Sequence, residues 1–289
     1  MRKLSIFFIF ISLIGYSQRS SYSPYSYFGV GETNFSATVE NQMMGGNTAY
    51  YDSVHQNMNN AASLSKLKFV NYSVGVDLKS TNYLSNSNNE KSTAAAINYI
   101  SVAIPTKSLS FSFGIKPKTS VGYLLENDDK SKTPPQLNRF TGDGGVSNAF
   151  VSIGFELFKN WGIGVSSSYA FGNLNHYHTK ILENVELYTM VSSESSISGL
   201  DYNLSTVYQK TFNEKITLYT TIVYQPEANY KSKNNQLIST INPNGGYGGD
   251  FEEIDLSSSG LKNTNVKIPS SLSFGLGFGQ DKKWFLGLN

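Results

Sequence analysis

The 289-residue sequence contains no cysteine, few charged residues and, after its first 17 residues, no long apolar run. Without cysteine the chain forms no disulfide and carries no lipid anchor on a cysteine. Charged residues make up 15% of the sequence, against about 25% in soluble domains. The net charge of +2 comes without a basic cluster, so the sequence shows no electrostatic footprint for nucleic acid. A membrane helix needs about 20 apolar residues, and the remaining sequence has no such run.

The first 17 residues have the composition of a secretory signal peptide. Arg2 and Lys3 are basic, residues 4–14 are apolar, and Gly15 and Ser17 are small residues at the two positions that a signal peptidase reads. The alternative is a retained membrane anchor, which needs a longer apolar run than this one. We therefore predict that residues 1–17 are removed on export to the outer membrane of a Gram-negative cell.

Most of the remaining sequence repeats short segments in which apolar and polar residues alternate. At bilayer depth every backbone polar group must be paired, so strands cross only as a closed barrel. We predict an all-β fold, a transmembrane antiparallel β-barrel over residues 68–289. A soluble secreted sandwich is the alternative, but it would carry more charge on its outer faces. The clearest alternating segments are residues 71–79, 109–116, 149–157, 161–172, 200–208, 216–224 and 271–288.

The expected connections between these strands differ in length. Residues 159–160, 213–214 and 280–283 are predicted to be short periplasmic turns. Long, polar surface loops are predicted at residues 126–145, 173–198 and 229–266. About eleven strands are countable, whereas bacterial barrels normally have an even number. We therefore expect the sequence to be C-terminally incomplete, with roughly three further strands in a barrel of about 14.

Residues 18–67 do not alternate, and they contain two short motifs. The first is Met43-Met44-Gly45-Gly46-Asn47-Thr48-Ala49 and the second is Asn59-Asn60-Ala61-Ala62-Ser63-Leu64. Together with residues 114–117, 121–123 and 268–275, these motifs resemble the long-chain fatty-acid outer-membrane transporters of the FadL/TodX family. The family has a proline where Asn60 stands, so the chain resembles a divergent member.

The resemblance implies a monomeric barrel with residues 18–67 as an N-terminal hatch inside it. It implies as partners hydrophobic small molecules, namely fatty acids or aromatic hydrocarbons, together with outer-membrane lipid. Methionine adapts to flexible ligands, and paired glycines permit a tight turn. The alternative role of the hatch side chains is packing against the barrel wall. The ligand-binding hatch residues implied by the resemblance are Met43, Met44, Gly45, Gly46, Met58, Asn59 and Ala61.

The sequence gives little support to an enzyme. Nucleophilic catalysis without cysteine needs Ser or Thr with a base, and the only histidines are His55, His176 and His178. His176 and His178 could share a strand face as metal ligands, but no third ligand stands near them in the sequence. The acidic stretch 250–255 does not fit the spacing of a calcium loop. We predict no catalytic residue, no metal site and no cofactor, and we place both stretches in solvated loops.

The main functional prediction is an outer-membrane channel that takes up long-chain fatty acids or other hydrophobic compounds. The alternative is a non-transporting outer-membrane barrel that acts as an assembly component, a secretion partner or a receptor. A general porin is a weaker third alternative, because the inward-facing residues are mostly Ser, Gly and Asn. A continuous apolar path from the surface to the barrel wall would distinguish the transporter.

Overall fold

The computed structural model describes residues 23–35, 37–84, 89–213, 215–243, 246–280 and 283–289. The predicted signal peptide lies outside these residues. The described helices are the short elements η2 (Pro24–Tyr27), α2 (Val39–Met43) and η3 (Ala61–Lys66). The strands are β1 (Glu32–Thr33), β2 (Asn71–Leu84), β3 (Asn89–Pro105), β4 (Ser110–Asp129), β5 (Gln136–Phe158), β6 (Trp161–Leu182), β7 (Tyr188–Phe212), β8 (Ile216–Gln225), β9 (Ala228–Ile241), β10 (Tyr247–Glu253), β11 (Asn263–Ile268), β12 (Ser271–Gln280) and β13 (Trp284–Leu288).

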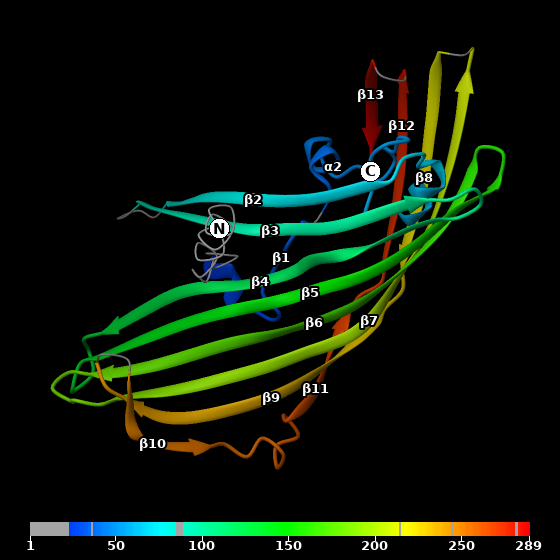
Figure 1. Cartoon of the computed structure of the whole chain (residues 1–289). Coiled ribbons are helices and arrows are strands. Elements are labelled where there is room, and N and C mark those ends of the chain that lie inside the picture. Colours follow the sequence, from blue (N-terminus) through cyan, green and yellow to red (C-terminus); the bar gives the residue numbers. More distant parts are fainter. Residues whose placement is uncertain (1–22, 36, 85–88, 214, 244–245, 281–282) are drawn as a thin grey trace, which may run out of the picture.

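All of these strands belong to one antiparallel sheet of 13 strands. The main path runs β13-β12-β8-β7-β6-β5-β4-β3-β2, so β2 to β8 pair as successive hairpins (Figure 1). β9 also pairs with β7, and β10 and β11 pair with β9. The prediction of an all-β antiparallel fold is confirmed. The predicted closed barrel is not observed, because β2 and β13 are separate edges of the sheet in the part of the chain that is described.

Two breaks interrupt the sheet beside β7. β7 pairs with β8 along its C-terminal part and with β9 along its N-terminal part. Pro226-Glu227 separates β8 from β9, and Pro269-Ser270 separates β11 from β12. Proline has no N–H to donate to a ladder, so regular pairing stops at both places. The two breaks lie side by side, because β8 pairs with β12 and β9 pairs with β11.

The predicted long surface loops are mostly strand. β4 and β5 form one long hairpin with only residues 130–135 between them, and β6 and β7 form another with only residues 183–187 between them. Residues 229–266 contain most of β9 and β11 and all of β10. The loop prediction is wrong because these stretches are mainly polar on the convex face and carry only scattered apolar residues, such as Leu174, Ile197 and Tyr230, on the concave face. They therefore lack the apolar-polar alternation that marks a half-buried strand.

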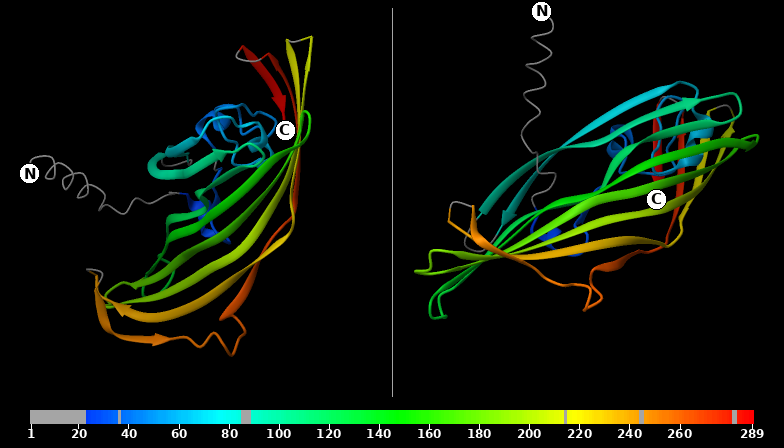
Figure 2. Two further views of the ribbon diagram at one scale, coloured as in Figure 1. Left: turned by 45° about the vertical axis from the view of Figure 1, so that its right-hand side comes forward. Right: turned by 60° about the horizontal axis from the view of Figure 1, so that its bottom comes forward.

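The sheet has an exposed apolar face and a buried face of small residues. In β6, Val165 is 46% exposed, while Gly164 and Ser166 on either side are buried. The cross-strand partners of Val165 are Ile153 and Leu204, which are exposed in the same way. We call the exposed face convex and the buried face concave, after the curvature visible in Figure 2. Further exposed apolar residues are Val74 and Val76 on β2, Ile115 on β4, Ile222 on β8 and Phe274 on β12.

The apolar character of the convex face ends partway along the long strands. In β6 the exposed residues change from Tyr169 and Phe171 to Asn173. In β7 they change from the exposed Leu200 to the serines at 198 and 196. We call the part of the convex face between the short turns and Phe171 the apolar band. The continuation of the strands beyond it is the polar extension.

Residues 23–70, the N-terminal segment, lie on the concave side of the sheet (Figure 2). β1 pairs with β4, and the N–H of Ser23 donates to the carbonyl of Gly122 at 2.8 Å. η3 contacts β3 to β7 near the short turns. Within the described ranges, no helix has both the length and the apolar composition to cross a membrane.

Candidate partner-binding site at the short-turn end of the sheet

Two of the sheet residues beneath η3, Gly154 on β5 and Gly164 on β6, have no side chain. A Cβ on Gly154 would lie 2.5 Å from the carbonyl oxygen of Ala61, and a Cβ on Gly164 would lie still closer to the backbone of Ala61 and Ala62. Both distances are shorter than atoms tolerate. η3 therefore rests directly on the backbone of β5 and β6, an approach that only glycine permits.

Buried hydrogen bonds fix the position of η3 on the sheet. Asn60, the residue before η3, donates from Nδ2 to the Thr221 hydroxyl at 3.0 Å. The N–H of Ala62 donates to the Ser205 hydroxyl at 2.8 Å. Breaking such a bond leaves a buried polar group without its partner, which costs about 1–3 kcal/mol. The Ser and Thr residues of the concave face thus act as specific contacts for the N-terminal segment.

A recess of about 960 Å³ opens where the N-terminal segment meets the short turns. One wall consists of residues 50–54 and 65–68 of the segment. The opposite wall consists of the end of β5, the β7–β8 turn and the β12–β13 turn. Because the segment supplies one wall, the recess exists only while the segment is seated on the sheet.

The recess has an excess of positive charge. Its described lining carries a formal net charge of +2. Lys66 Nζ lies 2.8 Å from Glu156 Oε1 near the surface, a kind of pair that contributes about 0–1 kcal/mol. Lys68 forms no ion pair with any described residue, so its charge remains available. The charged lining residues are Lys66, Lys68, Lys215, Lys283, Asp52 and Glu156.

Aromatic rings join the N-terminal segment to the strands around the recess. The rings of Tyr50 and Phe285 meet edge to face with their centroids 5.0 Å apart. Tyr219 contacts Phe285 at 5.6 Å and Tyr51 at 5.3 Å, also edge to face. Such pairs add about 0.5–1.5 kcal/mol beyond their buried area. The recess therefore combines an apolar aromatic side with a basic rim.

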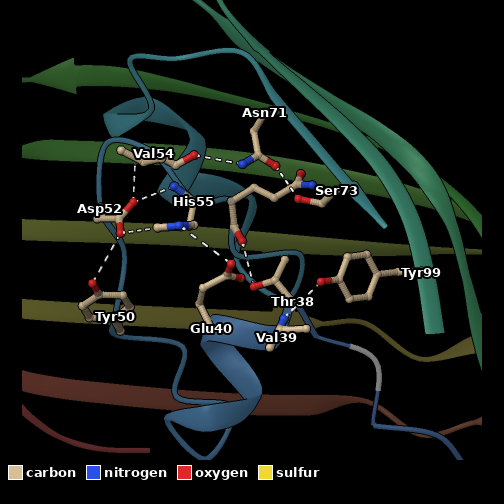
Figure 3. Close-up of polar contacts among 11 residues, drawn as sticks. Thr38, Val39, Glu40, Tyr50, Asp52, Val54, His55, Asn71, Ser73 and Tyr99 are labelled. Atoms are coloured by element: carbon tan, nitrogen blue, oxygen red, sulfur yellow. Dashed lines mark hydrogen bonds and ion pairs between the residues drawn. The ribbon is translucent and has the colours of Figure 1, made fainter. Parts of the chain in front are cut away.

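A polar cluster holds the loop that forms one wall of the recess (Figure 3). Asp52 Oδ1 accepts hydrogen bonds from the N–H groups of Val54 at 2.7 Å and His55 at 2.6 Å. Asp52 Oδ2 lies 2.7 Å from His55 Nδ1 and accepts from the Tyr50 hydroxyl at 3.3 Å. On the other side of the ring, His55 Nε2 lies 3.7 Å from Glu40 on α2. The cluster thus ties the loop to α2.

These surroundings shift two pKa values in the loop. Partial burial raises the pKa of Asp52, but the hydrogen bonds from His55 and Val54 outweigh it, and the net pKa lies below the usual value. Burial, with a smaller effect of Tyr219, raises the pKa of Tyr51 well above its usual value. At neutral pH Asp52 is therefore ionised, and Tyr51 keeps its phenol proton.

The structure does not bring the predicted ligand residues into one site. Met43 is 85% exposed on α2, whereas Met44 lines the recess. Gly45 and Gly46 form the turn after α2 with φ of +71° and +73°, in the left-handed region that favours glycine. The paired glycines therefore serve a turn, and only Met44 of these four residues faces the recess.

The second predicted motif serves the attachment of the segment. Met58 and Asn59 are half-buried. Asn59 Oδ1 accepts a hydrogen bond from Lys116 Nζ on β4 at 3.2 Å. Ala61 is buried against the glycines of β5 and β6. These contacts are the packing role that we gave as the alternative.

His176 and His178 lie on β6 and not in a loop. His176 Nδ1 lies 2.7 Å from the hydroxyl of Tyr123, and the His178 ring stacks on Phe140 with centroids 4.4 Å apart. No group of three or more acidic or histidine side chains is placed to hold a metal in the described part of the chain.

Most residues of the recess were not predicted from the sequence. Lys68, Lys215 and Trp284 lie far apart in the sequence, and the fold brings them together at one end of the sheet. A signal was present, since each stands at the end of an alternating segment. Ends of hairpins on the same side of a meander meet in space.

The fold is that of an all-β protein, a curved antiparallel sheet with an apolar convex face and an N-terminal segment on its concave face. The model of the BamG family matches residues 1–289, and the chain belongs to the BamG family. The family to which the chain belongs indicates association with the outer membrane. No curated protein and no solved structure matches the chain significantly.

Two predictions are corrected by this membership. The BamG family is a family of BAM complex components and is distinct from the FadL/TodX transporters, so the predicted family is wrong. The predicted fatty-acid and aromatic-hydrocarbon partners are also wrong, because the family points to proteins of the BAM complex. The resemblance rested in part on Gly45-Gly46 and Asn59-Asn60-Ala61, which here form a turn and a packing contact, and also on residues 114–117, 121–123 and 268–275, which here are strand and turn residues of the sheet.

Proposed function

We propose that this protein is a non-enzymatic outer-membrane component of the BAM complex, and that the recess binds a segment of another protein of that complex. The observation that carries the proposal is the recess itself, walled by the N-terminal segment and the strand ends in a chain of the BamG family. In this proposal residues 1–17 direct export, residues 18–67 complete the recess and residues 68–289 form the membrane-embedded sheet.

The dimensions of the apolar band support insertion in a bilayer. A membrane-spanning strand needs about 9–11 residues when tilted by about 45°. The exposed apolar run of β6 from Trp161 to Phe171 has this length. The free edges of β2 and β13 would leave unpaired backbone groups in lipid. We therefore propose that the sheet closes into a barrel in the membrane.

The chemistry of the recess indicates an acidic partner segment that also carries apolar side chains. The net charge of +2 attracts carboxylates, and complementary charge favours both encounter and specificity. The aromatic side formed by Tyr50 and Phe285 suits an apolar side chain. With short turns on the periplasmic side of a barrel, the recess faces the periplasm.

The proposal is tested by photocrosslinking in cells. A photoreactive phenylalanine analogue at position 68, on the rim of the recess, is expected to crosslink to a BAM complex protein. The same analogue at position 132, an exposed site on the β4–β5 connection at the other end of the sheet, is the control. Equal crosslinking at both positions, or none at position 68, contradicts a partner in the recess.

A charge-reversal pair separates binding from folding. Lys68→Glu with Lys283→Glu should weaken capture of the complex about five- to tenfold, or ~1–1.4 kcal/mol. Lys130→Glu with Lys132→Glu makes the same charge change outside the recess and should leave capture unchanged. Heat-dependent gel mobility checks that both variants fold.

A further inference from the structure

Two lysines lie on the convex face at the boundary between the apolar band and the polar extension. Lys231 on β9 is exposed and pairs directly with Ser198 of β7, which in turn pairs with Phe171. Directly paired residues point to the same face of a sheet. Lys231 therefore lies in the row of Phe171, at the end of the apolar band. Lys233 is exposed one row further out, opposite Ser196.

The concave side of β9 is filled by buried side chains, so both lysines point away from the core. Tyr230 and Ser232, which alternate with them, are buried on the concave face. Tyr230 packs with Val146 and Ile197 in the largest buried apolar cluster of the described chain. The two ammonium groups are thus directed to the side on which lipid lies in the proposed orientation.

Lys231 and Lys233 form no ion pair with the charged residues around them in the described part of the chain. Lys267 on β11 projects beside them but forms an ion pair with Glu227 at 2.8 Å. Neither Lys231 nor Lys233 has an ion pair with a described residue. The nearest acid on the same face of β7 is Glu194, one row beyond Lys233 and opposite Asn235. The neighbours of Lys231 across both ladders are Ser198 and Asn265, which are uncharged.

We propose that Lys231 and Lys233 bind the phosphate groups of an outer-leaflet lipid. The lipid would lay its acyl chains along Leu200 and Tyr169 of the apolar band while its headgroup reaches the two ammonium groups. Lysines near an anionic membrane surface gain about 1 kcal/mol each, or about fivefold in affinity. The inference rests on the proposed membrane orientation, and it concerns a different face from the recess.

The experiment uses the full chain in phosphatidylcholine nanodiscs titrated with bisphosphorylated lipid A. Bound lipid is measured by native mass spectrometry. Lys231→Gln with Lys233→Gln is expected to lower the apparent affinity about 25-fold, from about fivefold for each lysine. Lys231→Arg with Lys233→Arg should retain it. Lys130→Gln with Lys132→Gln removes the same charge from an exposed turn outside the band and should change the affinity less than twofold.

Equal losses in the two glutamine variants would show a non-specific effect of charge and would overturn the site. An unchanged affinity in Lys231→Gln with Lys233→Gln would also overturn it. The assay contains no partner protein. Lipid binding that depends on the two lysines, together with a failed crosslink at position 68, would therefore reject the recess partner and retain the lipid site.

Discussion

The two halves of β6 have the same backbone pairing but opposite convex surfaces. Between Trp161 and Phe171 the exposed residues are mainly apolar, and from Asn173 onward they are mainly polar. Both halves pair with β5 and β7, and the ladder with β5 shifts register once, between Glu156 and Phe158 beside the short turn. Hydrogen bonding therefore specifies the sheet along its length, while the side chains of the convex face divide it into the apolar band and the polar extension. In the proposed function the apolar band is the part that lies in lipid.

The concave faces of the two halves differ as well. In the half next to the short turns, glycines of β5 and β6 let the backbone of η3 come close. In the other half, large residues such as Tyr123 and Tyr230 fill the space themselves. One antiparallel β-sheet thus holds an inserted segment at one end and its own side-chain core at the other.

The largest effect is expected from a cation in the apolar band. Val165→Arg should destabilise the membrane-inserted protein by about 2–4 kcal/mol, because a lipid-facing cation near the midplane is poorly solvated. Asn173→Arg, on the same face of the same strand in the polar extension, should cost about 0–1 kcal/mol. Urea unfolding in lipid vesicles measures both. Equal destabilisation by Val165→Arg and Asn173→Arg would contradict the proposal that the apolar band lies in lipid and the polar extension does not.

The apolar half of the sheet was predictable from sequence and the polar extension was not. Strands such as Trp161–Phe171 alternate because their apolar residues lie on the exposed convex face and their small residues on the buried concave face, so period 2 is visible. Asn173 to Lys180 has polar residues on both faces, and its strand structure comes from pairing with β5 and β7. Long-range pairing leaves no periodicity in a single sequence.

The candidate site was less predictable than the sheet. The glycine pair at 45–46 was expected to make a turn, and it does. Lys68 and Phe285 line the recess only because the fold brings them together, which a single sequence does not reveal. Gly154 and Gly164 alternate with apolar residues in the sequence, and the structure places both on the concave face. That they receive η3 depends on a contact between segments about 90 residues apart.

A smaller effect is expected where η3 meets the sheet. Gly154→Val would place side-chain atoms against the carbonyl of Ala61 and should cost about 1–3 kcal/mol as an overpacked site. Ser167→Val, on the convex face of β6, adds a side chain of similar size without meeting η3. Trypsin cleavage at Lys66 and Lys68 should accelerate in the first variant alone. Unchanged protection in Gly154→Val would mean that η3 does not depend on this close approach.

The turn after α2 should be less sensitive than the sheet glycines. Gly45→Ala should cost about 1–2 kcal/mol, because its φ of +71° is unfavourable for an L-residue although nothing lies near its Cβ. Gly46→Ala has the same strain and also meets the ring of Phe35, which is exposed and can move. Urea midpoints should therefore rank wild type above Gly45→Ala and Gly45→Ala slightly above Gly46→Ala. A much larger loss in Gly46→Ala than in Gly45→Ala would place Phe35 in a fixed position, and the reverse ranking would contradict the contact with Phe35.

The smallest effect is expected from Asp52, whose hydrogen bonds hold a half-exposed loop. Asp52→Ala should reduce stability by about 1 kcal/mol at pH 7, since it removes the acceptor for the N–H groups of Val54 and His55. The folded-state pKa of Asp52 is lowered, so its contribution is present above the unfolded pKa of about 3.9 and is lost as pH falls through the folded pKa.

The pH profile distinguishes the ionised carboxylate from a simple packing role. Protection of the loop from proteolysis is measured with trypsin at pH 7 and with pepsin near pH 2. Wild type and Asp52→Ala should differ in this protection only at pH 7. Asp52→Asn keeps a side-chain oxygen as acceptor but does not titrate. At pH 7 its loss of protection relative to wild type should therefore be smaller than that of Asp52→Ala. A deficit of Asp52→Ala that persists near pH 2 would show that the carboxylate charge does not hold the wall of the recess.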